Sequence, residues 1–295
     1  MTHSRAYQHA GDLLRLQRYS AERFALDAGG WLHPGDIPHR LFNGGRGQNP
    51  ADLLRLWEDE VGEILGWALV NPRNGSFDVQ SHDDAVLHKA LTWIETKLVN
   101  AHIETELREG DSFFETIFTD RGFAPNPRAL PYHVLSRALD HVPPVPALPP
   151  GFSIRTAAGV HEAAALAAVH ASAFNSNGTA EQYARVMESP GYAAEREFVV
   201  VAPDGRFAAM TVTWHDALNR LGYFEPVGTH ADFRRLGLAR AMMIHAMGAM
   251  RAAGMGHAWV VHEAAEENPA SAALYASLGF TTQYRTLLWA KDRKA

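Results

Sequence analysis

The chain of 295 residues contains no cysteine. This absence excludes disulfide bonds, thiolate metal sites and a cysteine nucleophile. The chain also has no uninterrupted apolar run of about 18 residues, the length that a membrane-spanning helix needs. Its first residues contain no apolar segment typical of a secretory signal. We therefore expect a soluble, cytoplasmic protein with no membrane partner.

Positive charge is scarce as well, since the formal net charge is −6. Residues 1–150 hold 14 Lys and Arg against 20 Asp and Glu, whereas residues 151–295 hold 13 of each sign. A general nucleic-acid binder needs a basic surface, so a nucleic-acid partner is excluded. Two interpretations of the acidic half remain open: it steers a cationic amine substrate, or it only keeps the surface soluble.

Metal ligands at a recognisable spacing are also missing, although the chain contains 16 histidines. His262 is not followed by a second histidine four residues later. His215, His230 and His257 share no helical spacing that would place them around one ion. We therefore predict that the protein binds no metal.

A proline-rich segment marks a division of the chain. Five of the eight residues 143–150 are proline, which favours an extended, semi-rigid spacer and excludes a helix or a central strand. The length of the chain suits two domains. We predict an N-terminal domain at 1–142, a linker at 143–150 and a C-terminal domain at 151–295. A docking segment for a partner protein is the alternative interpretation of the linker.

Hydrophobic periodicity predicts a similar order of strands and helices in the two halves. In the first half we expect helices at 11–28, 85–100 and 111–120, and strands at 53–59, 64–70, 76–80, 103–107 and 132–139. In the second half we expect helices at 159–174, 179–188, 237–254 and from 268, and strands at 152–156, 198–202, 208–213, 221–229, 257–262 and 281–289.

The turn before the helix at 237–254 has a composition that suits a phosphate group. Gly237 allows close approach, and the first amides of a helix have no partner inside it. The helix dipole is positive at this end. Arg234, Arg235 and Arg240 add cations that pair with phosphate oxygens. A capped surface helix is the alternative interpretation of this stretch taken alone.

Two motifs in this half resemble those of a known family. The run Arg234-x-x-Gly237-x-Ala239 after a strand resembles the acetyl-CoA signature of the GNAT superfamily of N-acetyltransferases. The segment 268–280, with Tyr275 inside it and Leu-Gly-Phe at its end, is similar to the family's later helix. The resemblance implies an α+β (mixed α/β) fold of two tandem GNAT-like domains, each with a central mixed, mostly antiparallel sheet flanked by helices.

The resemblance also implies the residues of the cofactor site. The backbones of Val227 and Thr229 would bind the acetyl group and the pantetheine arm, and amides of the turn would hold the pyrophosphate. Each polar contact with a charged phosphate contributes about 1.5–3 kcal/mol. Asn268 would cap its helix and touch the cofactor, although a cap alone also explains the Asn-Pro sequence. The predicted set is Val227, Thr229, Arg234, Arg235, Leu236, Gly237, Leu238, Ala239, Arg240 and Asn268.

Two side chains are candidates for acid–base chemistry. By the resemblance, the hydroxyl of Tyr275 would protonate the departing thiolate, since a phenol with a pKa of about 10 is a reasonable donor. Packing of one helix face is the alternative role for this tyrosine. Glu225 shares the strand parity of Val227 and would take the proton from an attacking amine, directly or through water. A solvent-facing strand end is the alternative for the glutamate.

The first half repeats the order of elements but lacks the residues of the site. Segment 111–123 aligns with segment 268–280 without a gap, and Phe118 falls where Tyr275 stands. The stretch 80–90 has no glycine and no arginine, and it places two carboxylates where phosphates would need cations. We therefore predict that the first half is a degenerate GNAT-like copy that does not bind CoA.

These features predict an acyl-CoA-dependent N-acyltransferase that transfers acetyl from acetyl-CoA to a primary amine by direct attack in a ternary complex. Such a reaction needs no covalent enzyme intermediate, in keeping with the absence of cysteine. We expect a small-molecule or peptide amine as the acceptor, and a monomer or homodimer. The alternative is a non-catalytic CoA-binding or scaffold protein whose N-terminal half contacts a partner.

Overall fold

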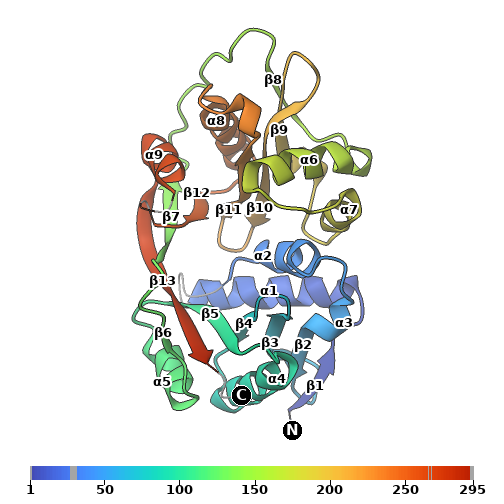
Figure 1. The fold of residues 1–295 in the computed structure, drawn as a ribbon, viewed down its shortest axis with the longest axis vertical. Helices are drawn as coiled ribbons and strands as arrows, with labels where there is room; N and C mark the ends of the chain where they lie inside the picture. The colour runs from blue at the N-terminus through green and yellow to red at the C-terminus, as the bar shows by residue number, and fades with distance from the viewer. Residues whose placement is uncertain (1, 27–31, 265, 267, 293–295) are drawn as a thin grey trace. The chain divides into compact units, whose positions relative to one another are not determined.

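The protein, seen in a computed structural model, is described over residues 2–26, 32–264, 266 and 268–292 (Figure 1). Internal contacts divide the chain into two compact units, Met1–Val134 together with Gln283–Ala295, and Leu135–Thr282. Each unit contains a run of neighbouring strands and a hydrophobic core of its own. Among the described residues, no helix combines the length and the apolar character needed to cross a membrane.

The first unit packs helices on a mostly antiparallel set of strands. Its strands follow the order β1-β2-β3-β4-β5-β13, and the β4–β5 ladder is parallel. Its core includes the fully buried side chains of Leu13, Leu16, Trp67, Leu91 and Ile94. The elements are β1 (His3–Ala6), α1 (Ala10–Leu26), α2 (Asp36–Pro38), the π-helix η1 (His39–Gly44), α3 (Pro50–Leu53), β2 (Leu54–Glu58), β3 (Ile64–Asn71), β4 (Ser76–Ser81), α4 (Asp84–Lys97), β5 (His102–Arg108), α5 (Ser112–Asp120), β6 (Ala124–Pro125) and the end of β13 (Thr281–Asp292).

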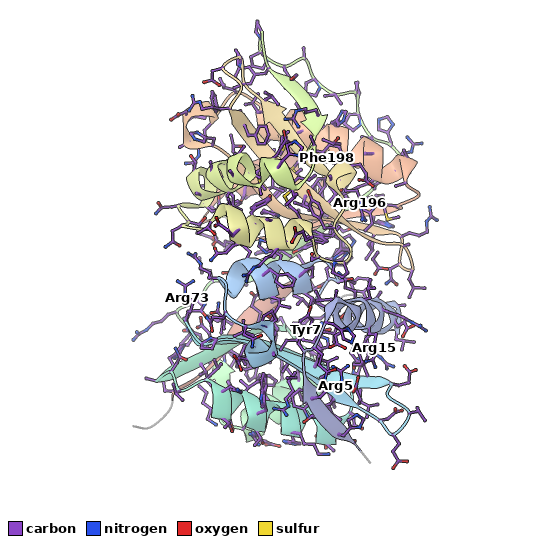
Figure 2. All side chains as sticks on the ribbon, turned by 90° about the vertical axis from the view of Figure 1, so that its right-hand side faces the viewer. Arg5, Tyr7, Arg15, Arg73, Arg196 and Phe198 are labelled. Carbon is purple, nitrogen blue, oxygen red and sulfur yellow. The ribbon has the colours of Figure 1, made fainter. Side chains whose placement is uncertain are left out.

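Buried charge ties the short strand β1 to this unit. The guanidinium of Arg5, labelled in Figure 2, donates to Asp12 at 2.6 Å and to Glu58 at 2.9 Å. Arg15 donates to Glu58 at 2.6 Å. Burial alone would raise the pKa of Asp12, but the hydrogen bonds from Arg5 and from the amide of Gln8, together with the charge of Arg5, hold that pKa below its ordinary value. Removing one member of such a network leaves an uncompensated buried charge, so these contacts fix the N-terminus of the unit.

The second unit carries the stretch that resembles the GNAT signature. Its strands follow the order β7-β12-β11-β10-β9-β8; the β11–β12 ladder is parallel, and the ladders from β11 to β8 are antiparallel. The elements are β7 (Tyr132–Ala138), β8 (Ser153–Thr156), the 3₁₀-helix η2 (Val160–Glu162), α6 (Ala163–Phe174), α7 (Ala180–Met187), the 3₁₀-helix η3 (Ala194–Arg196), β9 (Glu197–Val201), β10 (Phe207–Asp216), β11 (Leu221–Thr229), the 3₁₀-helix η4 (Ala231–Phe233), α8 (Leu238–Ala252), β12 (His257–His262), α9 (Pro269–Ser277) and the start of β13.

Strand β9 shows how this unit buries both faces of its sheet. Phe198 and Val200 join the core that contains the methionines of α8, whereas Val199 joins the core formed with α6 and α7. Successive side chains of a strand point to opposite faces, so the apolar run of β9 serves both layers. Helices therefore cover both faces of the sheet in this unit.

The predicted strands and helices are confirmed in their order, and the mixed α/β fold is confirmed with them. The predicted helix at 11–28 corresponds to α1, and residues 27 and 28 lie outside the described residues. A turn at 203–205 joins β9 to β10: the amide of Ala202 donates to the carbonyl of Arg206 at 2.9 Å, and Gly205 has a φ of 85°. The sequence pattern missed β1, α2, η1, α3 and β6 because each is short or rich in polar residues.

The compact units differ from the predicted domains in three places. The second unit begins at Leu135, so residues 135–142 of the predicted N-terminal domain belong to it. The proline-rich segment 143–150 forms no helix or strand, as predicted, but it falls within the second unit. From Gln283 onward the chain belongs to the first unit, because β13 pairs antiparallel with β5 from Thr286 to Asp292. The final strand of the C-terminal half thus supplies a strand to the N-terminal sheet.

Candidate active site

Strands β11 and β12 separate within the second unit. Their parallel ladder runs from Leu221, opposite His257, to Phe224, opposite Val260. Beyond Phe224, β11 continues to Thr229 beside β10 alone in the described ladders. Backbone groups on this side of β11 therefore lie outside the described ladders. The carbonyl of Thr229 accepts from Arg234 at 3.5 Å, and contact of Val227 or Thr229 with a cofactor stays a prediction.

A β-bulge lies where the two strands separate. In the β10–β11 ladder, Thr211 pairs with Val227 and Thr213 pairs with Phe224, so two residues of β11 face one residue of β10. The two residues are Glu225 and Pro226, and proline has no N–H to donate to a ladder. A bulge bends its strand and redirects its side chains, so it determines where the carboxylate of Glu225 points.

The predicted phosphate-binding turn has an open backbone. Arg235 and Gly237 both have left-handed conformations, with φ of 64° and 75°, on either side of the exposed Leu236. Helix α8 begins after Gly237, and no side chain caps it. A Cβ atom at Gly237 would meet nothing within 4 Å. The first-turn amides, which include those of Leu238 and Ala239, thus lie at an uncapped helix N-terminus that suits an anion.

The arginines of this turn have different surroundings. Arg234 donates to the carbonyl of Ala173 at 3.1 Å, so it fastens the turn to the end of α6. The amide of Ala231 adds a second link, to the hydroxyl of Ser172 at 3.0 Å. Arg235 is exposed. We infer that Arg234 shapes the turn, while a phosphate contact of its guanidinium stays a prediction, as do those of Arg235 and the half-buried Arg240.

The two predicted catalytic side chains act on each other electrostatically. Tyr275 is buried, with the rings of His262 and Phe280 at 5.7 and 6.0 Å. Burial raises the pKa of Tyr275, and the negative charge of Glu225 raises that pKa further. The phenol is therefore neutral at physiological pH and carries a proton that it can donate. Tyr275 both packs in the core and interacts with Glu225, so packing and an acid role are compatible.

Asn268 caps α9. Its side-chain oxygen accepts a hydrogen bond from the amide of Ser271 at 3.2 Å, and Pro269 occupies the first helical position. The predicted cap is therefore confirmed. Contact between Asn268 and the cofactor stays a prediction.

The corresponding place in the first unit is closed. Strand β4 pairs parallel with β5 at Ser76 and Glu104, and α4 follows β4. The carboxylate of Asp83 caps α4 by accepting from the amide of Val86 at 2.9 Å, so an anion of the protein itself occupies this helix N-terminus. Phe118 is fully buried and lies 6.2 Å from the ring of Phe77 and 5.1 Å from that of Phe123. These contacts support the prediction of a degenerate copy.

A buried carboxyl group near the site was not predicted. Glu197 starts β9 between Arg196 and Phe198, both labelled in Figure 2, and it is fully buried. Tyr183 of α7 donates to one carboxyl oxygen at 2.5 Å, and Tyr192 donates to the other. Burial raises the pKa of Glu197 to about 7, although the two hydroxyls oppose the shift. The signal in the sequence was a glutamate directly before the apolar run Phe-Val-Val-Val.

The described residues contain no group of three or more His, Cys, Asp or Glu side chains arranged to hold a metal ion. His245, in α8, lies 5.5 Å from the ring of Phe198 in an edge-on arrangement. This histidine is exposed on its helix.

Comparison with known proteins identifies the class. Residues 165–280 match the acetyltransferase (GNAT) family, and no curated protein matches the chain. In structure the chain is similar to a GCN5-related N-acetyltransferase from Sphaerobacter thermophilus, with a TM-score of 0.63 and 19% identity over 99% of this chain and 95% of that one. It is also similar to a tandem GNAT protein from the clavulanic acid biosynthesis pathway, with a TM-score of 0.66 and 15% identity over 100% of this chain and 99% of that one.

A third similar structure is a GNAT-family acetyltransferase from Colwellia psychrerythraea, with a TM-score of 0.59 and 11% identity over 98% of this chain and 99% of that one. The chain thus has the fold of a tandem GNAT protein. The match of residues 165–280 to the GNAT acetyltransferase family supports the transfer of an acyl group from acyl-CoA in general.

Proposed function

We propose that the protein is an N-acetyltransferase that moves the acetyl group of acetyl-CoA to a primary amine. The observation that carries this proposal is geometric: β11 separates from β12 beyond Phe224, at the point where Glu225 lies. Burial and the charge of Glu225 raise the pKa of Tyr275, which keeps the phenol protonated. An uncapped helix N-terminus at Gly237 follows the same strand. A scaffold protein has no chemical need for a buried acid and a carboxylate in this arrangement.

In this proposal the C-terminal half holds the acyl donor. The amides after Gly237 bind the pyrophosphate, and Arg235 and Arg240 add positive charge. The backbones of Val227 and Thr229, on the side of β11 away from β10, bind the pantetheine arm and the acetyl carbonyl. Bound acetyl-CoA supplies a thioester that an amine can attack.

The chain's own residues handle two protons. An amine with a pKa of about 10.4 is almost fully protonated at neutral pH, so it must lose a proton before it attacks. Glu225 accepts this proton, directly or through water. Tyr275 donates its proton to the departing thiolate, a step that a neutral phenol supports. The amine attacks the donor directly, and no acyl-enzyme forms.

A thiol-release assay with a panel of amines tests the proposal. Because the chain contains no cysteine, any thiol that appears is the released CoA. We expect release that depends on one class of amine, with the acetylated amine detected by mass spectrometry. Binding of acetyl-CoA without amine-dependent release for every amine class would favour the alternative, a non-catalytic CoA-binding protein. A cytoplasmic location and a monomeric or homodimeric state remain predictions.

A further inference from the structure

The bulge that carries Glu225 leaves a backbone carbonyl outside the β10–β11 pairing. Two residues of β11 face one residue of β10 at this point, so the ladder does not supply a partner for every backbone group. The indole N–H of Trp214 donates to the carbonyl of Glu225 at 2.9 Å. A buried side chain of the neighbouring strand thus makes the hydrogen bond that a regular ladder would make.

Trp214 is itself held in a buried network. Its side chain is 2% exposed, and the ring of Tyr192 meets it edge-on at 6.3 Å. Tyr192 donates its hydroxyl to Glu197, which also accepts from Tyr183. Contacts therefore run without interruption from α7 and β9 through Tyr192 and Trp214 to the backbone of Glu225. A side chain packed on all sides cannot easily change rotamer, so the position of the indole is fixed.

We propose that Trp214 is a positioning residue for acyl transfer: its hydrogen bond fixes the bulge, and the bulge aims the carboxylate of Glu225. This inference rests on the proposed function, in which Glu225 accepts the proton of the amine. Tyr192 and Glu197 contribute by holding the indole in place. None of these three side chains needs to touch the substrate.

The test combines kinetics with hydrogen exchange in the full chain. Trp214→Phe keeps an aromatic ring but removes the N–H. We expect it to lower kcat for the amine found in the panel by about tenfold to hundredfold, the range that a misplaced reacting group produces. Binding of acetyl-CoA should change less than threefold, because the turn at Gly237 is untouched.

A double-mutant cycle shows whether Trp214 acts through Glu225. In a Glu225→Gln background, Trp214→Phe should lower kcat less than twofold further. The same fold loss in both backgrounds would overturn the inference, as would wild-type kcat in the single variant. Trp289→Phe in the first unit is the matched control: Trp289 is buried, and its indole N–H has no hydrogen-bond acceptor within the described residues.

Amide exchange gives a readout that is independent of activity. Peptides covering 221–229 should exchange at least tenfold faster in Trp214→Phe and unchanged in Trp289→Phe. If the wild type transfers no acyl group, the proposed function fails, and exchange alone decides whether Trp214 holds the bulge. Unchanged exchange in Trp214→Phe overturns the claim that Trp214 fixes the bulge.

A milder pair of variants applies if Trp214→Phe does not fold. Tyr192→Phe and Tyr183→Phe each remove one hydroxyl from Glu197, but only the ring of Tyr192 meets Trp214 in the described contacts. Faster exchange at 221–229 in Tyr192→Phe than in Tyr183→Phe supports the inference. Equal exchange in the two variants overturns it.

Discussion

Replacing Glu197 by glutamine tests how the ionisation of a buried carboxyl group affects the stability of the second unit. Glu197 is fully buried and accepts from Tyr183 and Tyr192. Glutamine has nearly the same shape as the protonated acid, and its amide can accept from one hydroxyl and donate to the oxygen of the other. We therefore expect the variant to fold with a stability close to that of the wild type at acidic pH.

The magnitude follows from the pKa of Glu197, which burial raises from 4.5 to about 7. At about 1.4 kcal/mol per pKa unit, this shift corresponds to about 3 kcal/mol. Between these two pH values the folded state binds more protons than the unfolded state, so the stability contributed by this group falls as pH rises. The contribution is complete below pH 4.5 and is lost above pH 7. The glutamine variant lacks this loss, so it should be the more stable protein by about 3 kcal/mol at pH 8.

Urea unfolding at a series of pH values from 4.5 to 8 measures this difference. Subtracting the variant's free energy of unfolding from that of the wild type cancels the other titrating groups. Glu162→Gln is the control, because the hydrogen bond from Arg155 lowers the pKa of Glu162. A lowered pKa changes the stability only below about pH 4.5, so the difference for Glu162→Gln should stay nearly flat from pH 4.5 to 8. A flat difference for Glu197→Gln across this range would refute the assigned burial of an ionisable carboxyl group.

Four further predictions concern the site and the sheet. Gly237→Glu should fold with a stability lower by about 1 kcal/mol, since a Cβ there meets nothing within 4 Å but a side chain at a φ of 75° is strained. It should lose CoA binding by calorimetry because a carboxylate repels phosphate, and normal binding would refute the pyrophosphate assignment. Tyr275→Phe should keep CoA affinity and lower kcat by roughly 10²-fold, the lower end of the range for a lost general acid. An unchanged kcat would show that Tyr275 only packs in the core. Calorimetry should find one CoA per chain, and two equivalent sites would contradict the closed first unit. Deleting residues 283–295 should expose the amides of β5 to rapid exchange, because β13 pairs with β5, and full protection would contradict this pairing.

Local sequence signals predicted most elements of the second unit because their causes are local. The turn at 203–205 has a glycine that tolerates a positive φ, and Asn268 places an acceptor at the start of a helix. The apolar run that starts at Phe198 is long enough for a strand that buries both faces. Strand β1 was missed because charged residues stabilise it, with Arg5 bound to carboxylates from two other elements.

The residues of the candidate site were predictable only in part. The turn at Gly237 has a sequence signature, and the structure gives it the expected uncapped helix. The end of the β11–β12 ladder depends on the pairing with β12, which lies later in the chain, beyond α8. The residues of β11 alone do not predict where this pairing ends. The predicted role of Arg234 was incomplete for the same reason. The carbonyl that Arg234 binds belongs to Ala173, 61 residues earlier. The pairing of β13 with β5 is likewise non-local.

The two halves of the chain use the same position in opposite ways. In each half a helix follows a strand whose next neighbour is parallel, at Asp83 in the first and at Gly237 in the second. A carboxylate cap stabilises a helix by about 0.5–2 kcal/mol and satisfies the amides that a phosphate would need. Gly237 provides no cap, so its helix leaves these amides to a ligand. Removing the cap with Asp83→Gly would not create a second CoA site, because Phe118 is fully buried among the rings of Phe77 and Phe123.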